Sequence, residues 1–271
     1  MTGALHVFDE AIAVTPLPDA TFTARTHPAY NNMVGPFGGV IAGSVINALQ
    51  QHPDALGAPL AFTVNYVAPV AAGEWLLRPQ IVRTNRTNQH WLFTVEQGGG
   101  IVSSGSAVFG VRRDTWGDTE ATPPAAGEPA DHEPVWFPEV IAWDKNYEKR
   151  FVTGRWDAQS DDSTSTLWVR DNPPRPLDFP ALASIADVFY PRVFLRRGGY
   201  VPAGTISLTT YFHATEAELA AQGDDYVLAT AHSARFVGGH FDQHGQIFGR
   251  AGALLATTAQ IVYFKDAASA R

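Results

Sequence analysis

The sequence predicts an α+β protein in which one unit, a helix followed by a four-stranded antiparallel meander, occurs twice. Three observations lead to this prediction. An early segment with helical apolar spacing precedes four short segments rich in β-branched and aromatic residues. The same order returns in the second half, and a stretch without apolar periodicity separates the two. A sheet wrapped around one helix is the arrangement that this order favours.

The first predicted helix covers residues 37–53. Its apolar residues recur at helical spacing, and Pro53 ends the pattern. The four segments that follow are separated by Gly, Asn or Pro and read as consecutive strands. They cover residues 60–69, 74–84, 90–97 and 100–113. The glycines within 96–101 form a hairpin turn in this interpretation, because no helix follows them as it would in a phosphate-binding loop.

Residues 115–138 form the best candidate for a linker. They are rich in Pro, Gly, Ala and acidic residues, and they show neither a helical nor a strand-like apolar period. The predicted division is therefore an N-terminal unit over 1–114, the linker over 115–138, and a C-terminal unit over 139–271.

The second unit begins with a predicted helix over 176–190. Asp178 is a plausible N-cap, and Pro180 falls in the first turn. Four strands follow, at 205–213, 226–238, 245–250 and 253–264. A short helix is expected over 215–225, an extra strand near 166–170, and a turn at 240–244.

Composition restricts the classes of function. Hydrophobic residues make up 45% of the chain and charged residues 17%, which is enough apolar material for a large core. The formal net charge of −8, without a basic cluster, argues against a nucleic-acid partner. The chain has no cysteine, which excludes disulfides and thiolate chemistry and fits a reducing cytoplasm. No apolar run is long enough for a membrane span, so we expect a cytoplasmic protein.

Five motifs together resemble the acyl-CoA thioesterase II family of double-hotdog thioesterases. The resemblance covers roughly residues 25–265 and depends on the order and spacing of the motifs. They are FGG (37–39), LWVRDN (167–172), SIADVF (184–189), GTISLTTYFH (204–213) and TTAQIVYF (257–264). The resemblance implies a double hotdog, with two repeats of a long helix wrapped by an antiparallel sheet, and an acyl-CoA substrate. Ala214 and Thr215 stand where the family usually has Arg-Pro, which leaves acyl preference and CoA contacts open.

The resemblance also implies three catalytic residues. Family members use an Asp, a Thr and a Gln to activate water against an acyl-CoA thioester, and these match Asp187, Thr205 and Gln260. The residues themselves support this in part. Gln260 shares a strand face with mainly apolar residues, so its amide needs hydrogen-bond partners. Strict alternation places Thr205 on the face of Ser207 and Thr209, and helical spacing places Asp187 in the last turns of the second helix, at the rim of the core.

An alignment of the two halves indicates one functional and one vestigial site. Each candidate residue in the second half aligns with a neutral or apolar residue in the first half. The pairs are Asp187 with Asn47, Gln260 with Ala107, and Thr205 with a residue near Leu60. Asparagine cannot accept a proton at neutral pH, so only the second half carries a base.

The predicted chemistry is hydrolysis of a thioester by a positioned water, with Asp187 as the base, and it requires no cofactor and no metal. The histidines lack metal-ligand spacing. Two alternatives stay open: a non-catalytic acyl-CoA binding protein, and a hotdog enoyl-CoA hydratase or dehydratase. Such a hydratase would place a catalytic His beside an acid near the central helix, and the second predicted helix has none. The oligomeric state is also open, with a homo-oligomer among the options.

Overall fold

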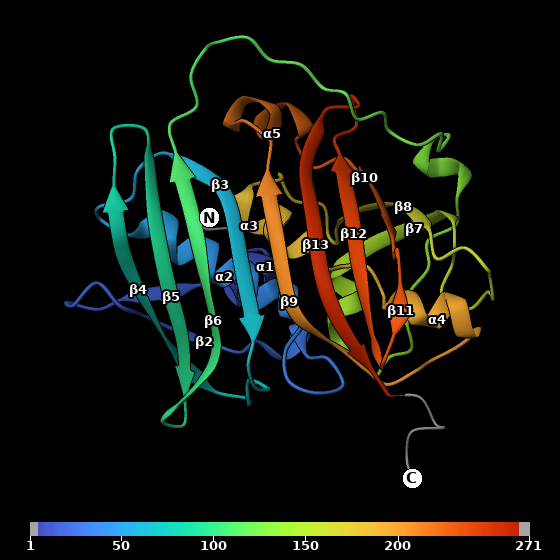
Figure 1. Cartoon of the computed structure of the whole chain (residues 1–271), viewed down its shortest axis with the longest axis horizontal. Helices are drawn as coiled ribbons and strands as arrows, with labels where there is room; N and C mark the ends of the chain where they lie inside the picture. Colours follow the sequence, from blue (N-terminus) through green and yellow to red (C-terminus); the bar gives the residue numbers. More distant parts are fainter. Residues whose placement is uncertain (1–4, 266–271) are drawn as a thin grey trace.

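A computed structural model describes residues 5–265 of the chain. Thirteen antiparallel strands form one continuous sheet. In the view of Figure 1, α2 and α3 pack behind this sheet, and no helix lies in front of it. The strand order is β1-β2-β4-β5-β6-β3-β9-β13-β12-β10-β8-β7, and β11 pairs with β12. We call the face that packs against α2 and α3 the inner face and the opposite face the outer face.

The first half contributes six of these strands and two helices. They are α1 (Val7–Ala11), β1 (Val14–Pro16), β2 (Phe22–Arg25), α2 (Gly38–Gln51), β3 (Ala58–Tyr66), β4 (Glu74–Thr84), β5 (Asn88–Gln97) and β6 (Gly100–Gly110). The predicted helix and the four strands after it are confirmed. The short elements before α2 lay in a segment for which no structure was predicted.

The second half contributes seven strands and three helices. They are β7 (Tyr147–Thr153), β8 (Ser165–Asp171), α3 (Phe179–Ile185), α4 (Arg192–Arg197), β9 (Ala203–Phe212), α5 (Glu216–Gln222), β10 (Val227–His232), β11 (Phe236–Val237), β12 (His240–Phe248) and β13 (Leu254–Phe264). The extra strand near 166–170 and the helix within 215–225 are confirmed. The turn predicted at 240–244 is wrong, because these residues form the first half of β12 and the reversal lies at Gly238 and Gly239.

The helix predicted over 176–190 begins as expected but ends early. Asp178 caps it by accepting a hydrogen bond from the N–H of Ala181, and its last residue is Ile185. Beyond that residue the N–H groups of Asp187 and Val188 bond to carbonyls three residues back, which tightens the chain out of the α-helix. The second helix is therefore short, and Asp187 lies just beyond its end instead of within its last turns.

The halves meet where β3 pairs with β9. Thr63 faces Thr209 across this seam, and their hydroxyl oxygens are 3.0 Å apart. Behind the seam α2 and α3 run antiparallel in close contact, since a Cβ at Gly39 would lie 2.5 Å from the carbonyl oxygen of Ser184. Both halves therefore build one core.

The segment between β6 and β7 crosses one end of the sheet, at the top of Figure 1. It contains the short 3₁₀ helices Pro129–Asp131 and Ala142–Asn146, and a further 3₁₀ turn, Pro28–Tyr30, precedes α2. Within residues 5–265, none of the helices is long and apolar enough to cross a membrane.

Candidate active site

The structure brings Asp187, Thr205 and Gln260 together in one chain of hydrogen bonds. The hydroxyl of Thr205 donates to Oε1 of Gln260 across 3.2 Å. The Nε2 of Gln260 donates in turn to Oδ1 of Asp187 across 3.0 Å. Three residues far apart in the sequence, from β9, β13 and the segment after α3, thus form a single polar cluster at the inner face.

Thr205 reaches this cluster because β9 contains a β-bulge. Ile261 pairs with Ser207 but Val262 pairs with Thr205, so Ile206 is an extra residue on β9. A one-residue bulge moves the following side chains to the other face of a sheet. The expectation that Thr205 shares a face with Ser207 is therefore wrong: Thr205 lies on the inner face, beside Gln260.

Gln260 is the central member of the chain. Its side chain is buried, with 6% relative exposure, and it stands in the middle of β13. Both ends of its amide are used, since Oε1 accepts from Thr205 and Nε2 donates to Asp187. The expectation that this amide must have partners is confirmed, and its orientation is fixed by them.

Asp187 faces the N-terminus of α2, which belongs to the other half of the chain. The N-cap residue of α2, Phe37, makes no side-chain hydrogen bond to this end of the helix, and the N–H of Gly39 bonds instead to the Asp187 carboxylate. Burial raises the pKa of Asp187 to about 7, although the hydrogen bonds from Gln260 and from the N–H of Gly39 oppose this rise. A carboxylate with a pKa near neutrality can both accept and return a proton at physiological pH.

Tyr66, at the end of β3, is a fourth residue of the cluster, and the sequence did not reveal it. Its hydroxyl donates to the carbonyl of Gly38 across 2.8 Å. That carbonyl and the N–H of Gly39 belong to the same peptide group, so Tyr66 and Asp187 hold opposite ends of one peptide. A Cβ at Gly38 would lie 2.8 Å from Oδ2 of Asp187 and 2.9 Å from Oη of Tyr66, so the site requires glycine there.

The corresponding place in the other half lacks this chemistry. Asn47 lies within α2 and donates to the carbonyl of Ile12 across 2.9 Å, and Ala107 has no polar group. The bulge is repeated, because Leu60 is an extra residue between Pro59 and Ala61 on β3. The counterpart of Thr205 is therefore Pro59, one residue from the expected position.

Tyr66 also has an apolar counterpart. Thr63 and Thr209 face each other at the seam. Tyr66 lies three residues after Thr63, and Phe212 lies three residues after Thr209. Phe212 packs edge-on against Phe179 at the start of α3, with ring centroids 5.8 Å apart. Phenylalanine thus occupies the place in which the first half presents a hydroxyl.

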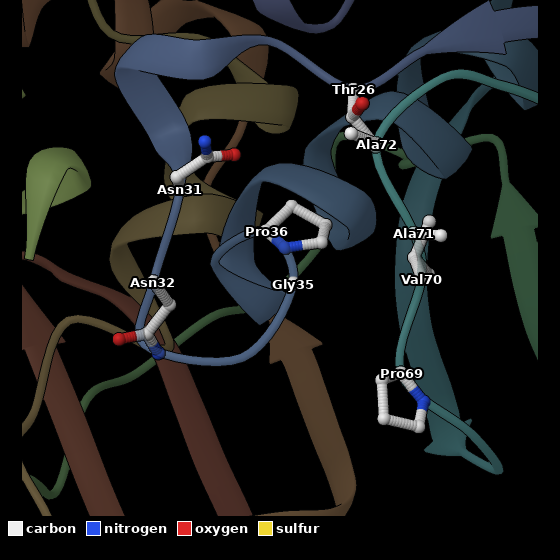
Figure 2. Close-up of a pocket in the computed structure, with 9 residues that line it drawn as sticks. All are labelled: Thr26, Asn31, Asn32, Gly35, Pro36, Pro69, Val70, Ala71 and Ala72. Atoms are coloured by element: carbon white, nitrogen blue, oxygen red, sulfur yellow. The ribbon is translucent and has the colours of Figure 1, made fainter.

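A pocket of about 300 Å³ opens beside the N-terminus of α2. Figure 2 shows its two walls, the loop before α2 and the segment after β3. The residues that line it are Thr26, Asn31, Asn32, Gly35, Pro36, Pro69, Val70, Ala71 and Ala72. None of these is charged. Both walls of the pocket are close in sequence to residues of the cluster. Pro36 is two residues from Gly38, and Pro69 is three residues from Tyr66.

No group of three or more His, Cys, Asp or Glu side chains among residues 5–265 is placed to hold a metal ion. His52 follows the last residue of α2 and packs against Phe22 and Trp91. Burial lowers its pKa, and the charge of the nearby Asp54 opposes this decrease. The Nδ1 of the ring accepts a hydrogen bond from the N–H of Asp54 across 3.2 Å.

Two family models match the chain. Residues 27–110 match the model described as acyl-CoA thioesterase N-terminal domain, and residues 119–264 match the acyl-CoA thioesterase C-terminal domain. A crystal structure of a conserved protein of unknown function with hot dog fold from Alicyclobacillus acidocaldarius is 40% identical, with a TM-score of 0.94 over 97% of this chain and 99% of that one. A search of curated proteins found no match.

More distant structures carry thioesterase names. An acyl-CoA thioesterase II, TesB2, from Mycobacterium marinum is 17% identical, with a TM-score of 0.75 over 95% of this chain and 98% of that one. The tesB protein of Mycobacterium avium subs paratuberculosis is 18% identical, with a TM-score of 0.77 over 96% and 98%. At such identities these two show a shared fold alone. The fold and the cluster define an α+β protein of the hotdog class. The family matches then identify the chain as a member of the acyl-CoA thioesterase II family.

Proposed function

We propose that the protein is a double-hotdog acyl-CoA thioesterase that hydrolyses an acyl-CoA thioester to the free acid and CoA. Asp187 is the general base in this proposal, and Thr205 and Gln260 position the attacking water. The observation that carries it is the unbroken hydrogen-bond chain from Thr205 through Gln260 to Asp187. Membership of the family supports the same reaction.

The reaction needs one base and no strong nucleophile. Water held beside Asp187 and Gln260 attacks the thioester carbonyl carbon while Asp187 accepts its proton. The tetrahedral intermediate collapses, the carbon–sulfur bond breaks, and the proton held by Asp187 passes to the leaving thiolate. A pKa of about 7 suits both transfers.

Tyr66 and the start of α2 support the base in this proposal. The positive end of the α2 dipole and the N–H of Gly39 stabilise the carboxylate, while burial destabilises it. The balance leaves a base that is ionised at slightly alkaline pH and still basic enough to take a proton from water. Tyr66 holds the peptide that supplies the N–H.

Two other functions compete with this one. A non-catalytic acyl-CoA binding protein would have no need for a buried carboxylate whose pKa is raised to about 7. A hydratase would need a histidine beside an acid. His52 follows the C-terminus of α2, at the end of this helix opposite to Gly39 and Asp187, and it packs against Phe22 and Trp91.

The test is release of free thiol from a panel of short, medium, long and aromatic acyl-CoAs, measured with and without a chelator. We expect turnover of at least one substrate and no effect of the chelator. A protein that binds acyl-CoA but hydrolyses none of the panel would instead be a binding module. Hydration of an enoyl-CoA without thiol release would support the hydratase.

A further inference from the structure

The first turn of α2, which supplies the N–H group to Asp187, consists of residues with little conformational preference. Gly38 leaves room for Asp187 and Tyr66, and a Cβ at Gly39 would lie 2.6 Å from Cζ of Phe37, so the packing excludes larger residues at both positions. Glycine has the greatest backbone freedom of any residue. The side chain of Phe37 does not cap the helix by a hydrogen bond either. The peptide between the two glycines therefore needs support from outside this turn, in addition to the hydroxyl of Tyr66.

The aromatic ring of Phe37 gives this support. It folds back over Gly39, and the indole of Trp143 stacks on it with ring centroids 4.0 Å apart and 9° between the planes. Both aromatic side chains are buried. Phe37 begins α2 in the first half of the chain, whereas Trp143 lies just before β7 in the second half. The stack therefore ties the start of α2 to the second half, which also carries the base.

The segment around Trp143 holds the indole in place. The N–H of Trp143 donates to the carbonyl of Asn31 across 3.2 Å. The Nζ of Lys149 lies 5.0 Å from the centroid of the indole, within the range of a cation–π contact. Lys149 forms an ion pair with Asp144, and both side chains are buried. Separating a buried ion pair is costly, so the pair permits few arrangements of this segment. The indole is thus fixed where it contacts Phe37.

The pKa of Asp187 depends on the position of the supported peptide. Burial raises this pKa, and the hydrogen bonds from Gln260 and from the N–H of Gly39 lower it. Tyr66 is titratable and faces Asp187, but burial raises its own pKa well above its usual range, so it stays neutral. A displaced Gly39 would weaken one of the two hydrogen bonds and raise the pKa of Asp187 further.

We propose that Trp143 is a positioning residue of this site. By stacking on Phe37, it holds the N–H of Gly39 in place for the hydrogen bond to Asp187. It acts through Phe37 and is not a catalytic residue. The proposal rests on the proposed thioesterase function, in which Asp187 is the base.

The test is Trp143→Leu, which removes the aromatic stack and keeps an apolar side chain. The pKa of Asp187, measured by carbon NMR titration of protein labelled at aspartate, should rise by at least ~0.5, and Asp187→Asn identifies the signal. The acid limb of the pH–rate profile should move to higher pH, and kcat at neutral pH should fall by ~3–10-fold. Trp143→Phe keeps a ring that can stack, so it should restore most of both.

Trp168→Leu is the matched control. Trp168 is 4% exposed and Trp143 is 6% exposed, and Trp168 also has a cation over its ring, Arg250 at 5.0 Å. It belongs to a separate buried cluster with Leu228 and Phe248. Both variants should lower the Tm, because each loses a buried indole. Only Trp143→Leu should change the pKa of Asp187.

Combining Trp143→Leu with Tyr66→Phe gives a second measurement. If both side chains act on the same peptide, the combined loss in kcat is smaller than the product of the two single losses. A product of the single losses would mean independent effects and would contradict the proposal.

An unchanged pKa of Asp187 in folded Trp143→Leu would overturn the proposal, and so would an equal rise in Trp168→Leu. If Trp143→Leu does not fold, Phe37→Leu removes the other ring of the stack and serves the same test. The titration requires no turnover. A raised pKa in a protein that releases no thiol supports the positioning role and rejects the thioesterase, whereas thiol release with an unchanged pKa rejects the positioning role alone.

Discussion

The cluster at Asp187 and the place around Asn47 occupy equivalent parts of two repeated units, but they differ in their polar side chains and in the helix, which ends before Asp187 and continues past Asn47. Both units have a strand bulge before the seam, at Ile206 and at Leu60. The second half carries the hydrogen-bonded chain to Asp187, whereas the first half has Ala107 in place of Gln260, and Phe212 stands at the position equivalent to that of Tyr66. The comparison teaches that the fold alone does not make a site. A few polar side chains on a shared scaffold do.

The largest expected effect comes from replacing the carboxylate of Asp187 by the amide that its counterpart Asn47 carries. Asp187→Asn keeps the shape of the side chain but removes proton acceptance, so kcat should fall by about 10²–10⁴-fold with little change in KM. Steady-state kinetics and thermal unfolding should be measured on the same preparation. Retained activity would exclude Asp187 as the base, and loss of activity together with a collapsed Tm would make it a structural residue.

Gln260→Ala should have the next largest effect. Removing the amide breaks both hydrogen bonds of the chain, so we expect a loss of roughly 10²-fold in kcat. Asn47→Ala is the matched change in the other half and should stay within a few-fold of wild type. Equal losses in the two variants would contradict the one-site comparison.

Tyr66→Phe gives the fourth residue of the cluster the residue type found at its equivalent position, Phe212. Without the hydroxyl, the peptide of Gly38 and Gly39 is held less firmly and its N–H stabilises the carboxylate less. We expect kcat to fall by about 10-fold and the acid limb of the pH–rate profile to move to higher pH. Tyr263→Phe, an exposed tyrosine on β13, is the control. A reduced rate with an unmoved profile would leave Tyr66 a packing role only.

The smallest effect is on stability. The folded state holds a proton on Asp187 up to a pKa of about 7, whereas an unfolded Asp releases it near 4. The stability contributed by this proton is complete below about pH 4 and is lost as the pH rises through 7. Asp187→Asn removes this loss, so its Tm should exceed that of wild type at pH 8 more than at pH 5.

Wild type must be compared at each pH in that experiment. Burial also raises the pKa of Asp171 to about 7, so part of the pH dependence will remain in the variant. A Tm difference between Asp187→Asn and wild type that is the same at pH 5 and pH 8 would show that Asp187 is already ionised throughout this range.

Much of the fold could be predicted because local patterns determine it. The start of α3 followed from Asp178 and Pro180, and most strands followed from runs of β-branched residues. The candidate residues came from their motifs. The orientation of the Thr205 side chain toward the inner face could not be predicted. It results from a bulge, which depends on the pairing with the partner strand and is not visible in the alternation of polar and apolar residues along β9.

Two other residues were missed for related reasons. Gln243, which pairs in register with Gln260, lies in HFDQH (240–244). The polar residues of this motif are typical of a turn, and only the pairing with β13 shows that they form a strand. Tyr66 ends a strand of the first half, and its partner Gly38 begins the helix before it. Neither contact has a signature in the sequence, since both depend on how distant segments meet.

The cluster crosses the seam between the halves, and this has a consequence for the order in which activity appears during synthesis. The backbone N–H at Gly39 emerges from the ribosome early, and Gln260 emerges more than two hundred residues later. Yet β13, which carries Gln260, lies in the interior of the sheet between β9 and β12. A nascent chain that lacks this strand would have an open gap in the sheet and an incomplete cluster. Hydrolytic activity would then report the final closure of the whole sheet.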